Sequence, residues 1–229
     1  MFFFFFNYKP YIAIIGDIIG SKQIKERNVV QKKLNDTLDI INKKFPEAIA
    51  SKFMITLGDE FQGLLKAGSN TIEIIEYIER KMYPTQIRFG IGVGEITTTI
   101  NPDIPIGADG PAYYNAREMI NNLKEIKRRK KEIDTNIMIG TSNNNEVDIL
   151  LNAIFGLCTF IKSKWTNRQR EIIYDCMEHG DNQIKAAERL GITQSSVQKN
   201  LSNSGYYSYK KTMDTISNVL SEIKGDINV

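Results

Sequence analysis

The order of strand-like and helix-like segments constrains this chain more than any other feature of its sequence. The run YIAIIGDII at residues 11–19 is apolar and rich in β-branched side chains except for Asp17, which is typical of a strand buried on both faces. Apolar residues then recur at helical spacing over residues 28–45 and 70–83, and each segment stops before a proline. Two strands joined by a turn at Gly58 lie between these predicted helices. The segments therefore begin in the order β-α-β-β-α.

A glycine-rich strand, QIRFGIGVGEITT, extends this order to β-α-β-β-α-β. Such an order gives an antiparallel hairpin beside the first strand, with both helices as crossovers. It predicts a split βαβ, or ferredoxin-like, sheet of the α+β class. A helix at 111–131, a short strand NIMIGTS and a helix at 146–164 follow. We therefore predict an α+β domain over residues 1–145 and a connecting helix over residues 146–165.

Two carboxylates stand at strand ends that this topology brings together. Asp17 ends the first strand, and Asp59 follows the glycine of the hairpin turn. Carboxylates at adjacent strand ends repel each other unless a cation lies between them, and Mg²⁺ prefers such oxygen ligands. The pair therefore indicates a magnesium site. A Gly-Asp hairpin turn and an Asp17 that caps the following segment explain the same residues without a metal.

The segment IIGSK after Asp17 has the features of a phosphate-binding turn. Gly20 and Ser21 can turn the chain after Ile18 and direct backbone N–H groups at phosphates, and Lys22 adds a positive charge. Two Mg²⁺ ions on the carboxylates would bridge a triphosphate and a 3′-hydroxyl. A nucleoside triphosphate is therefore the ligand expected at this end of the sheet.

A second, all-α module is predicted over residues 166–229. WTNRQREIIYDCMEHG and DNQIKAAERLG form two helices that end at Gly180 and Gly191, and ITQSSVQKNLSNS forms a third. A helix, a turn and a helix that begins with small polar residues are the pattern of a DNA-binding helix-turn-helix. The segment DTISNVLSEI indicates a last amphipathic helix, which either mediates dimerisation or packs on the module.

The third helix of this module carries side chains suited to reading DNA. Glutamine pairs with adenine, serine with several base edges, and lysine with guanine or phosphate. The predicted base contacts are Gln194, Ser195, Ser196, Gln198 and Lys199, and the predicted phosphate contacts are Arg168 and Arg170. We expect Asp181 to cap the second helix and Ile184 to lie in the core of the module. The alternative is a helical hairpin used for dimerisation or for packing on the first domain.

Four motifs resemble those of nucleotide cyclases. DIIGSK and LGDEFQ are similar to the two metal-binding segments of class III nucleotide cyclases and of GGDEF diguanylate cyclases. IRFGIGVGEI is similar to their glycine-rich strand, and DGPAYYNARE to the helix that supplies a transition-state arginine. The resemblance implies a palm-type, cyclase-like fold with Asp17 and Asp59 as Mg²⁺ ligands. It also implies catalytic roles for Glu60, the acid that follows in the GGDEF signature, and for Arg117.

Other positions depart from the cyclase pattern. Ile55 stands where adenine-selecting cyclases carry a lysine, and Tyr113 stands where the asparagine partner of the arginine is expected. Leu57 replaces the first glycine of the GGDEF signature. The metal-binding pair is therefore complete, whereas base selection and part of the transition-state clamp are not matched.

As a whole, the chain resembles a SatD-family protein, in which a cyclase-like domain precedes a helix-turn-helix. This resemblance implies a DNA-binding transcriptional regulator whose first domain binds Mg²⁺-nucleotide or serves as a sensor or dimerisation domain. A homodimer fits paired DNA half-sites. The alternatives are a nucleotidyl cyclase or nucleotidyltransferase that uses two Mg²⁺ ions on a nucleoside triphosphate, and an inactive scaffold.

Composition bears on the partner and the compartment. The formal net charge of +3 is too small to indicate nucleic acid by itself, but residues 162–211 carry nine Lys or Arg against five Asp or Glu. Two cysteines without metal-ligand spacing favour reduced thiols and a cytoplasmic protein. The opening MFFFFF lacks the features of a signal peptide and is too short to span a bilayer. We expect it to form an edge strand or to pack on the core rather than to contact a membrane or a partner.

Overall fold

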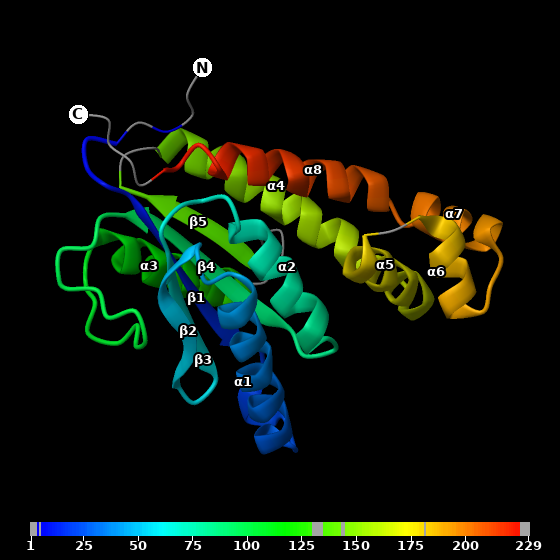
Figure 1. Cartoon of the computed structure of the whole chain (residues 1–229), viewed down its shortest axis with the longest axis horizontal. Helices are drawn as coiled ribbons and strands as arrows, with labels where there is room; N and C mark the ends of the chain where they lie inside the picture. Colours follow the sequence, from blue (N-terminus) through cyan, green and yellow to red (C-terminus); the bar gives the residue numbers. More distant parts are fainter. Residues whose placement is uncertain (1–3, 5, 130–134, 143–144, 181, 225–229) are drawn as a thin grey trace.

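The computed structural model describes residues 4, 6–129, 135–142, 145–180 and 182–224 (Figure 1). Its elements follow the predicted order, β-α-β-β-α-β-α-β-α, before the C-terminal helices begin. The strands are β1 (Tyr11–Ile18), β2 (Ile49–Leu57), β3 (Glu60–Leu65), β4 (Ile87–Gly94) and β5 (Ile137–Thr141). The helices are α1 (Arg27–Lys44), α2 (Thr71–Met82), α3 (Pro111–Arg129), α4 (Asn145–Ser163), α5 (Asn167–His179), α6 (Gln183–Leu190), α7 (Gln194–Asn203) and α8 (Tyr206–Leu220), with a 3₁₀ turn η1 (Ser21–Gln23) after β1. The predicted α+β class is confirmed.

The five strands form one mixed sheet in the order β2-β3-β1-β4-β5. β1 lies at the centre and is antiparallel to both β3 and β4, while β4 and β5 are parallel. The predicted pairing of the first strand with the hairpin is therefore confirmed. In this pairing Asp17 is in register with Glu60.

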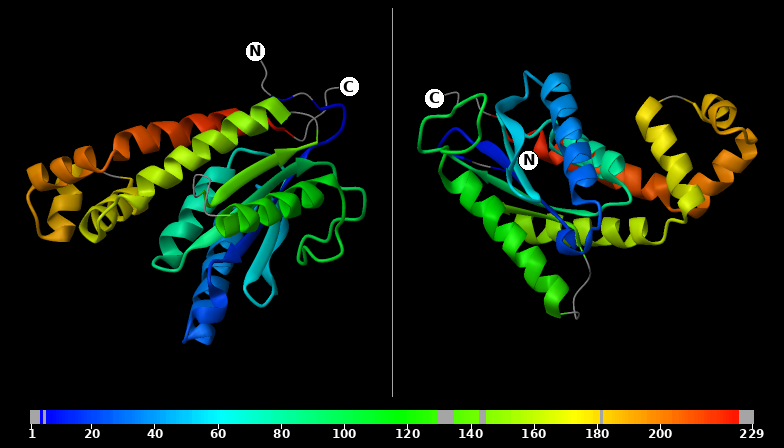
Figure 2. Two further views of the ribbon diagram at one scale, coloured as in Figure 1. Left: turned by 180° about the vertical axis from the view of Figure 1, so that it is seen from behind. Right: turned by 90° about the horizontal axis from the view of Figure 1, so that it is seen from below.

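Side chains of β1 alternate between two layers of the core, as the two-residue period of a strand requires. Ile12 and Ile14 belong to the large cluster that includes α1 and α2, whereas Ala13 and Ile15 belong to a smaller cluster with α3. Figures 1 and 2 show α1 and α2 on one face of the sheet and α3 on the other. The sheet is therefore covered on both faces.

Alternate glycines on β4 allow α3 to lie directly against the sheet. A Cβ atom placed on Gly92 would come within 2.0 Å of the carbonyl oxygen of Ala112, and one on Gly90 within 2.3 Å of that of Ala116. Any side chain larger than hydrogen would therefore push α3 away from the strand. The facing residues of α3 are small alanines, which complete the close contact.

Helices α4 and α8 connect the sheet to the outer helices. They run side by side in Figure 1, where α4 packs on β5 and α8 contacts both α2 and α4. α8 begins at Tyr206, after Gly205 in the left-handed conformation, and so starts eight residues before the segment DTISNVLSEI. Its side chains Tyr209, Met213 and Leu220 are buried in the same core as β1. The last helix therefore packs within the chain and returns toward the sheet.

The N-terminal phenylalanines contribute to the core where the structure describes them. Phe4 is buried, and its ring stacks with that of Phe6 at a centroid distance of 6.1 Å. This agrees with the prediction that the segment packs on the core, although residues 1–3 and 5 lie outside the described residues. Within the described part of the chain, every helix is too short or too polar to cross a membrane.

Replacing Gly92 with alanine tests the contact between α3 and β4. The added Cβ would overlap the carbonyl of Ala112, so we expect Gly92→Ala to lower the free energy of unfolding by about 2 kcal/mol or more, measured in urea. Gly140→Ala on β5 is the matched control, because its Cβ would first meet the mobile end of Met119 at 3.1 Å. Equal losses in the two variants would contradict this account.

Candidate functional site

A row of charged side chains crosses three strands at the end of the sheet where β1 stops. Asp17 on β1 is in register with Glu60 on β3 and with Arg88 on β4. Helix α3 adds Arg117 and Lys124, which contact the two acids. We call these five residues the charged row. It lies on the face of the sheet that α3 covers.

Both carboxylates of the charged row contact cations. Arg117 donates two hydrogen bonds to Glu60, with N···O distances of 2.5 and 2.7 Å, and these bonds raise its pKa. Asp17 accepts a hydrogen bond from Arg88 at 2.7 Å and pairs with Lys124 at 3.0 Å. The side chains of Asp17 and Arg88 are 9% and 12% exposed, so water screens this pair weakly, whereas the side chains of Arg117 and Lys124 are each 43% exposed. The repulsion expected between neighbouring acids is therefore offset by cations of the chain itself.

A magnesium ion does not fit the charged row as its side chains lie. Asp17 directs one oxygen to Arg88 and the other to Lys124. An ion bound there would have to displace one of these cations, and two positive charges would then lie close together. Within the described residues there is no group of three or more His, Cys, Asp or Glu arranged to hold a metal ion.

Asp59 has different surroundings from the charged row. It lines a hollow of about 190 Å³ beside the start of α1, together with Ile18 and Ser21. Gly20 is left-handed and begins the 3₁₀ turn that follows β1, and Lys22 is exposed in that turn. The structure thus brings Asp59 together with two of the predicted phosphate-binding residues, and its backbone oxygen accepts a hydrogen bond at 3.1 Å from Ile18, the residue that follows Asp17.

Helices α6 and α7 are joined by a short turn at the end of the molecule far from the sheet (Figure 1). Gly191 ends α6 in the left-handed conformation, and Thr193 caps α7 by accepting a hydrogen bond from the backbone N–H of Ser196 at 3.2 Å. The cap of α6 is Asn182, whose side chain accepts two backbone hydrogen bonds from the first turn of the helix. The predicted cap, Asp181, lies outside the described residues.

The core of the module differs from the prediction at Ile184. This side chain is 58% exposed, whereas Ala186 and Ala187 are buried with Val197 and Leu201. Helix α6 has little more than two turns, and its buried face is centred on the two alanines. Short alanine side chains let α5 and α7 pack closely on α6.

The first two turns of α7 present polar side chains to solvent. Gln194, Ser195, Gln198 and Lys199 are exposed, and Ser196 is half-buried. The predicted base-contacting residues therefore share one accessible stretch of helix.

Hydrogen bonds orient both glutamines of this stretch. Gln194 donates to the side-chain oxygen of Gln183 on α6 at 2.9 Å. Tyr207 on α8 donates to the side-chain oxygen of Gln198 at 2.9 Å. These bonds join α7 to the helices on either side of it, so the amide groups are held in place before any ligand binds.

The two predicted phosphate contacts, Arg168 and Arg170, lie in different places. Arg168 is exposed and pairs with Glu171 at 2.6 Å. Arg170 is half-buried and donates to the backbone oxygen of Lys162 at 2.8 Å. It also stacks on the rings of Tyr83, Trp165 and Tyr174. The guanidinium of Arg170 therefore holds α5 against the rest of the chain.

A family model described as the SatD family matches residues 11–220, from the first residue of β1 to the last residue of α8. The chain belongs to the SatD family. The matched region includes the sheet and all the C-terminal helices, so both parts belong to the unit that defines the family. No curated protein matches the chain.

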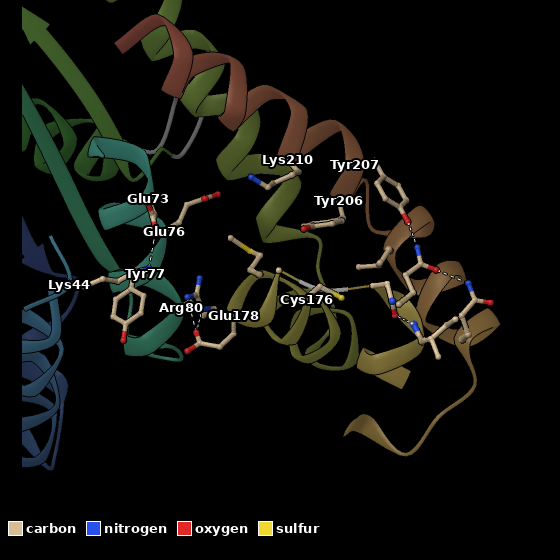
Figure 3. A pocket seen from close by; sticks show the side chains of 17 residues that line it. Lys44, Glu73, Glu76, Tyr77, Arg80, Cys176, Glu178, Tyr206, Tyr207 and Lys210 are labelled. Atoms are coloured by element: carbon tan, nitrogen blue, oxygen red, sulfur yellow. Dashed lines mark hydrogen bonds and ion pairs between the residues drawn. The ribbon is translucent and has the colours of Figure 1, made fainter. Parts of the chain in front are cut away.

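In this SatD-family protein a cleft of about 860 Å³ lies between α2 and the C-terminal helices (Figure 3). Glu76 and Tyr77 line it from α2, Tyr206 and Tyr207 from α8, and Gln183 from α6. Its volume is within the range of small-molecule sites. Gln183 and Tyr207 also orient the two glutamines of α7. A molecule bound in the cleft would therefore contact the residues that hold these glutamine side chains in position.

Two acidic residues of the cleft have partners within the chain. Arg80 on α2 pairs with Glu178 on α5 at 2.8 Å, which joins the two walls. Tyr209 donates to Glu76 at 2.9 Å, while burial raises the pKa of this carboxyl. The ion pair therefore couples the position of α5 to that of α2.

Sequence reasoning missed two members of the charged row, Arg88 and Lys124. Arg88 is a lone charge within an apolar strand, and Lys124 follows Arg117 by seven residues, which places both on one face of α3. Both positions are visible in the sequence. Their contact with Asp17 could not be predicted without the register of β1 with β4, which aligns Arg88 with Asp17.

Asp17→Asn tests whether the charged row stabilises the fold. The substitution leaves Arg88 with little solvent and no carboxylate, so we expect the free energy of unfolding to fall by about 2 kcal/mol or more. Asp59→Asn removes a carboxylate from the hairpin turn outside the row, and we expect a change within about 0.5 kcal/mol. Urea denaturation of both variants measures the difference, and an Asp17→Asn protein as stable as the unmodified chain would refute the structural role.

Proposed function

We propose that this SatD-family protein is a DNA-binding transcriptional regulator that reads duplex DNA with the first half of α7. The single observation that carries the proposal is the exposed, pre-oriented polar stretch at the start of this helix. A recognition helix contacts base edges through its N-terminal side chains, and a capped helix that follows a tight turn suits that task. The proposed base contacts are Gln194, Ser195, Ser196, Gln198 and Lys199.

The phosphate contacts in this proposal differ between the two arginines. Arg168 is exposed in the first turn of α5 and remains a candidate, since its partner Glu171 is itself exposed. Arg170 is left out, because its guanidinium already stacks on three aromatic rings within the chain. Phosphate contacts position a protein on the duplex, whereas base contacts give it a sequence preference.

For the sheet domain we propose a sensor and dimerisation role on a ferredoxin-like, cyclase-like palm. The order β2-β3-β1-β4, with α1 and α2 on one face, supports this relation. In the charged row, Asp17 and Glu60 are neutralised by cations of the chain, which supports a structural use of these acids. The cleft beside α2 offers a route by which this domain can influence α7.

A nucleotidyl cyclase is the second candidate, and one observation favours it. Asp17, Glu60 and Arg117, three residues that the cyclase resemblance selects, come together at one end of the sheet. Binding of a Mg²⁺-triphosphate there would require Arg88 or Lys124 to leave Asp17. Asp59 would have to be reached from a separate hollow.

DNA binding can be measured by fluorescence anisotropy with a random-sequence duplex at about 50 and 200 mM salt. We expect binding that weakens steeply with salt, because Lys199 and its neighbours contact phosphates or base edges. Lys199→Ala should weaken binding several-fold and reduce the salt slope by about one. Gln194→Ala should instead flatten the sequence preference found by selection from a random duplex library.

Lys43→Ala is the matched control for DNA binding, because Lys43 is an exposed lysine on α1, and this helix lies far from α7 (Figure 1). It removes the same charge and should leave the affinity and the salt slope nearly unchanged. If Lys199→Ala and Lys43→Ala behave alike, the proposed surface of α7 is wrong.

A thermal-shift titration with each nucleoside triphosphate and Mg²⁺ separates the regulator from the cyclase. Because both oxygens of Asp17 contact cations, we expect no Mg²⁺-dependent stabilisation that requires this residue. A cyclase site saturated with triphosphate would raise the melting temperature by about 5 °C or more. A shift of that size that Asp17→Asn abolishes, accompanied by pyrophosphate release, would favour the cyclase.

A further inference from the structure

The solvent face of α4 is apolar over three consecutive turns. Ile149, Leu150, Leu157 and Phe160 are 70%, 56%, 57% and 55% exposed, and Ala153 is exposed between them. A surface helix usually carries polar residues on this face, and a continuous apolar stripe marks an interaction site. The opposite face of α4 is already used, because it packs on β5 and α8.

The stripe has the spacing of a coiled-coil seam. Leu150, Ala153, Leu157 and Phe160 follow one another at intervals of three, four and three residues. This is the pattern with which one helix packs along another helix. The natural occupant of the stripe is therefore a second helix.

The stripe is also symmetric about position 155. Leu150 and Phe160 lie five residues on either side of this position, and Ala153 and Leu157 lie two residues on either side. Two antiparallel copies that cross at position 155 would place Leu150 against the partner's Phe160 and Ala153 against the partner's Leu157. A small side chain would then face a large one in the second pair, as close packing requires.

Charges at the ends of the stripe follow the same symmetry. Glu146 lies nine residues before position 155, and Lys164 lies nine residues after it. Both are exposed, and Lys164 lies over the ring of Phe160 at 4.9 Å. Antiparallel pairing brings Glu146 to the partner's Lys164, and two-fold symmetry produces this ion pair twice. A parallel pair would instead place Glu146 against another Glu146.

We propose that α4 is a homodimerisation helix that pairs antiparallel with α4 of a second copy, centred on position 155. The stripe, the size match and the charge match all select the same partner, because a two-fold interface must be complementary to itself. The inference names α4, and not the last helix, as the contact between copies. It does not rest on DNA binding.

The proposed pair keeps the outer helices of the two copies apart. Trp165, at the start of the outer helices, lies ten residues beyond position 155, or about 15 Å along a helix. In an antiparallel pair the two modules would begin about 30 Å apart, at opposite ends of the interface. The two copies of α5–α7 therefore do not compete for space.

The oligomeric state of the full chain tests the proposal. We expect light scattering after size exclusion to give twice the chain mass of 26.1 kDa at micromolar concentration. Leu157→Glu should give a monomer with an unchanged far-UV circular dichroism spectrum, because this side chain is exposed in the single chain. Val29→Glu on α1 is the matched control, since Val29 is 60% exposed and lies outside α4. A chain that is monomeric at 100 times that concentration, or a dimer that Leu157→Glu leaves intact, overturns the proposal.

Charge exchange tests the antiparallel register. Glu146→Lys and Lys164→Glu should each weaken the dimer by about threefold or more in sedimentation equilibrium, because each leaves two like-charge contacts. The double variant should regain most of the lost affinity. Failure of this rescue overturns the register. DNA binding by a monomeric Leu157→Glu protein would show that the two proposals are independent. The α4 dimer could then be wrong while DNA binding by α7 holds, or the reverse.

Discussion

The close contact between α3 and β4 is the constraint on which the sheet domain depends. Because Gly90 and Gly92 offer bare backbone, α3 lies near enough for its side chains to reach across to β1 and β3. Arg117 and Lys124 then contact Glu60 and Asp17, and Arg88 on β4 contacts the second oxygen of Asp17. The glycines of the strand that resembles the glycine-rich cyclase strand thus have a packing role, and the charged row is its consequence.

A second set of contacts fixes the outer helices to this domain. Lys162 pairs with Glu79 at 2.7 Å in largely buried surroundings, and Arg170 stacks among three aromatic rings nearby. Trp165 donates to the backbone oxygen of Ser204 at 2.9 Å, which ties the start of the module to its end. α8 also packs on α2 and α4. Any movement of α7 relative to the sheet would therefore change these contacts or the shape of the adjacent cleft.

The spacing of apolar residues along the sequence predicted the order of elements, the hairpin and the pairing of β1, because these features depend on short-range sequence patterns. It did not predict which acid would lie beside Asp17. A shift of one residue at the hairpin turn changes which residue of β3 faces Asp17. In the observed register the residue that faces Asp17 is Glu60 and not Asp59. The predictions for Ile184 and Arg170 failed to describe their surroundings for a related reason. A short helix has several possible buried faces, and an arginine near aromatic rings is as useful inside the chain as on its surface.

Asp17 illustrates how the neighbours of a carboxylate decide what it contacts in the folded chain. A carboxylate binds Mg²⁺ or a guanidinium according to what its neighbours supply, and in this chain β4 supplies Arg88. One basic residue opposite the first acid therefore makes Asp17 half of an ion pair in this structure. Our proposal therefore assigns recognition to α7, whose first two turns expose polar side chains.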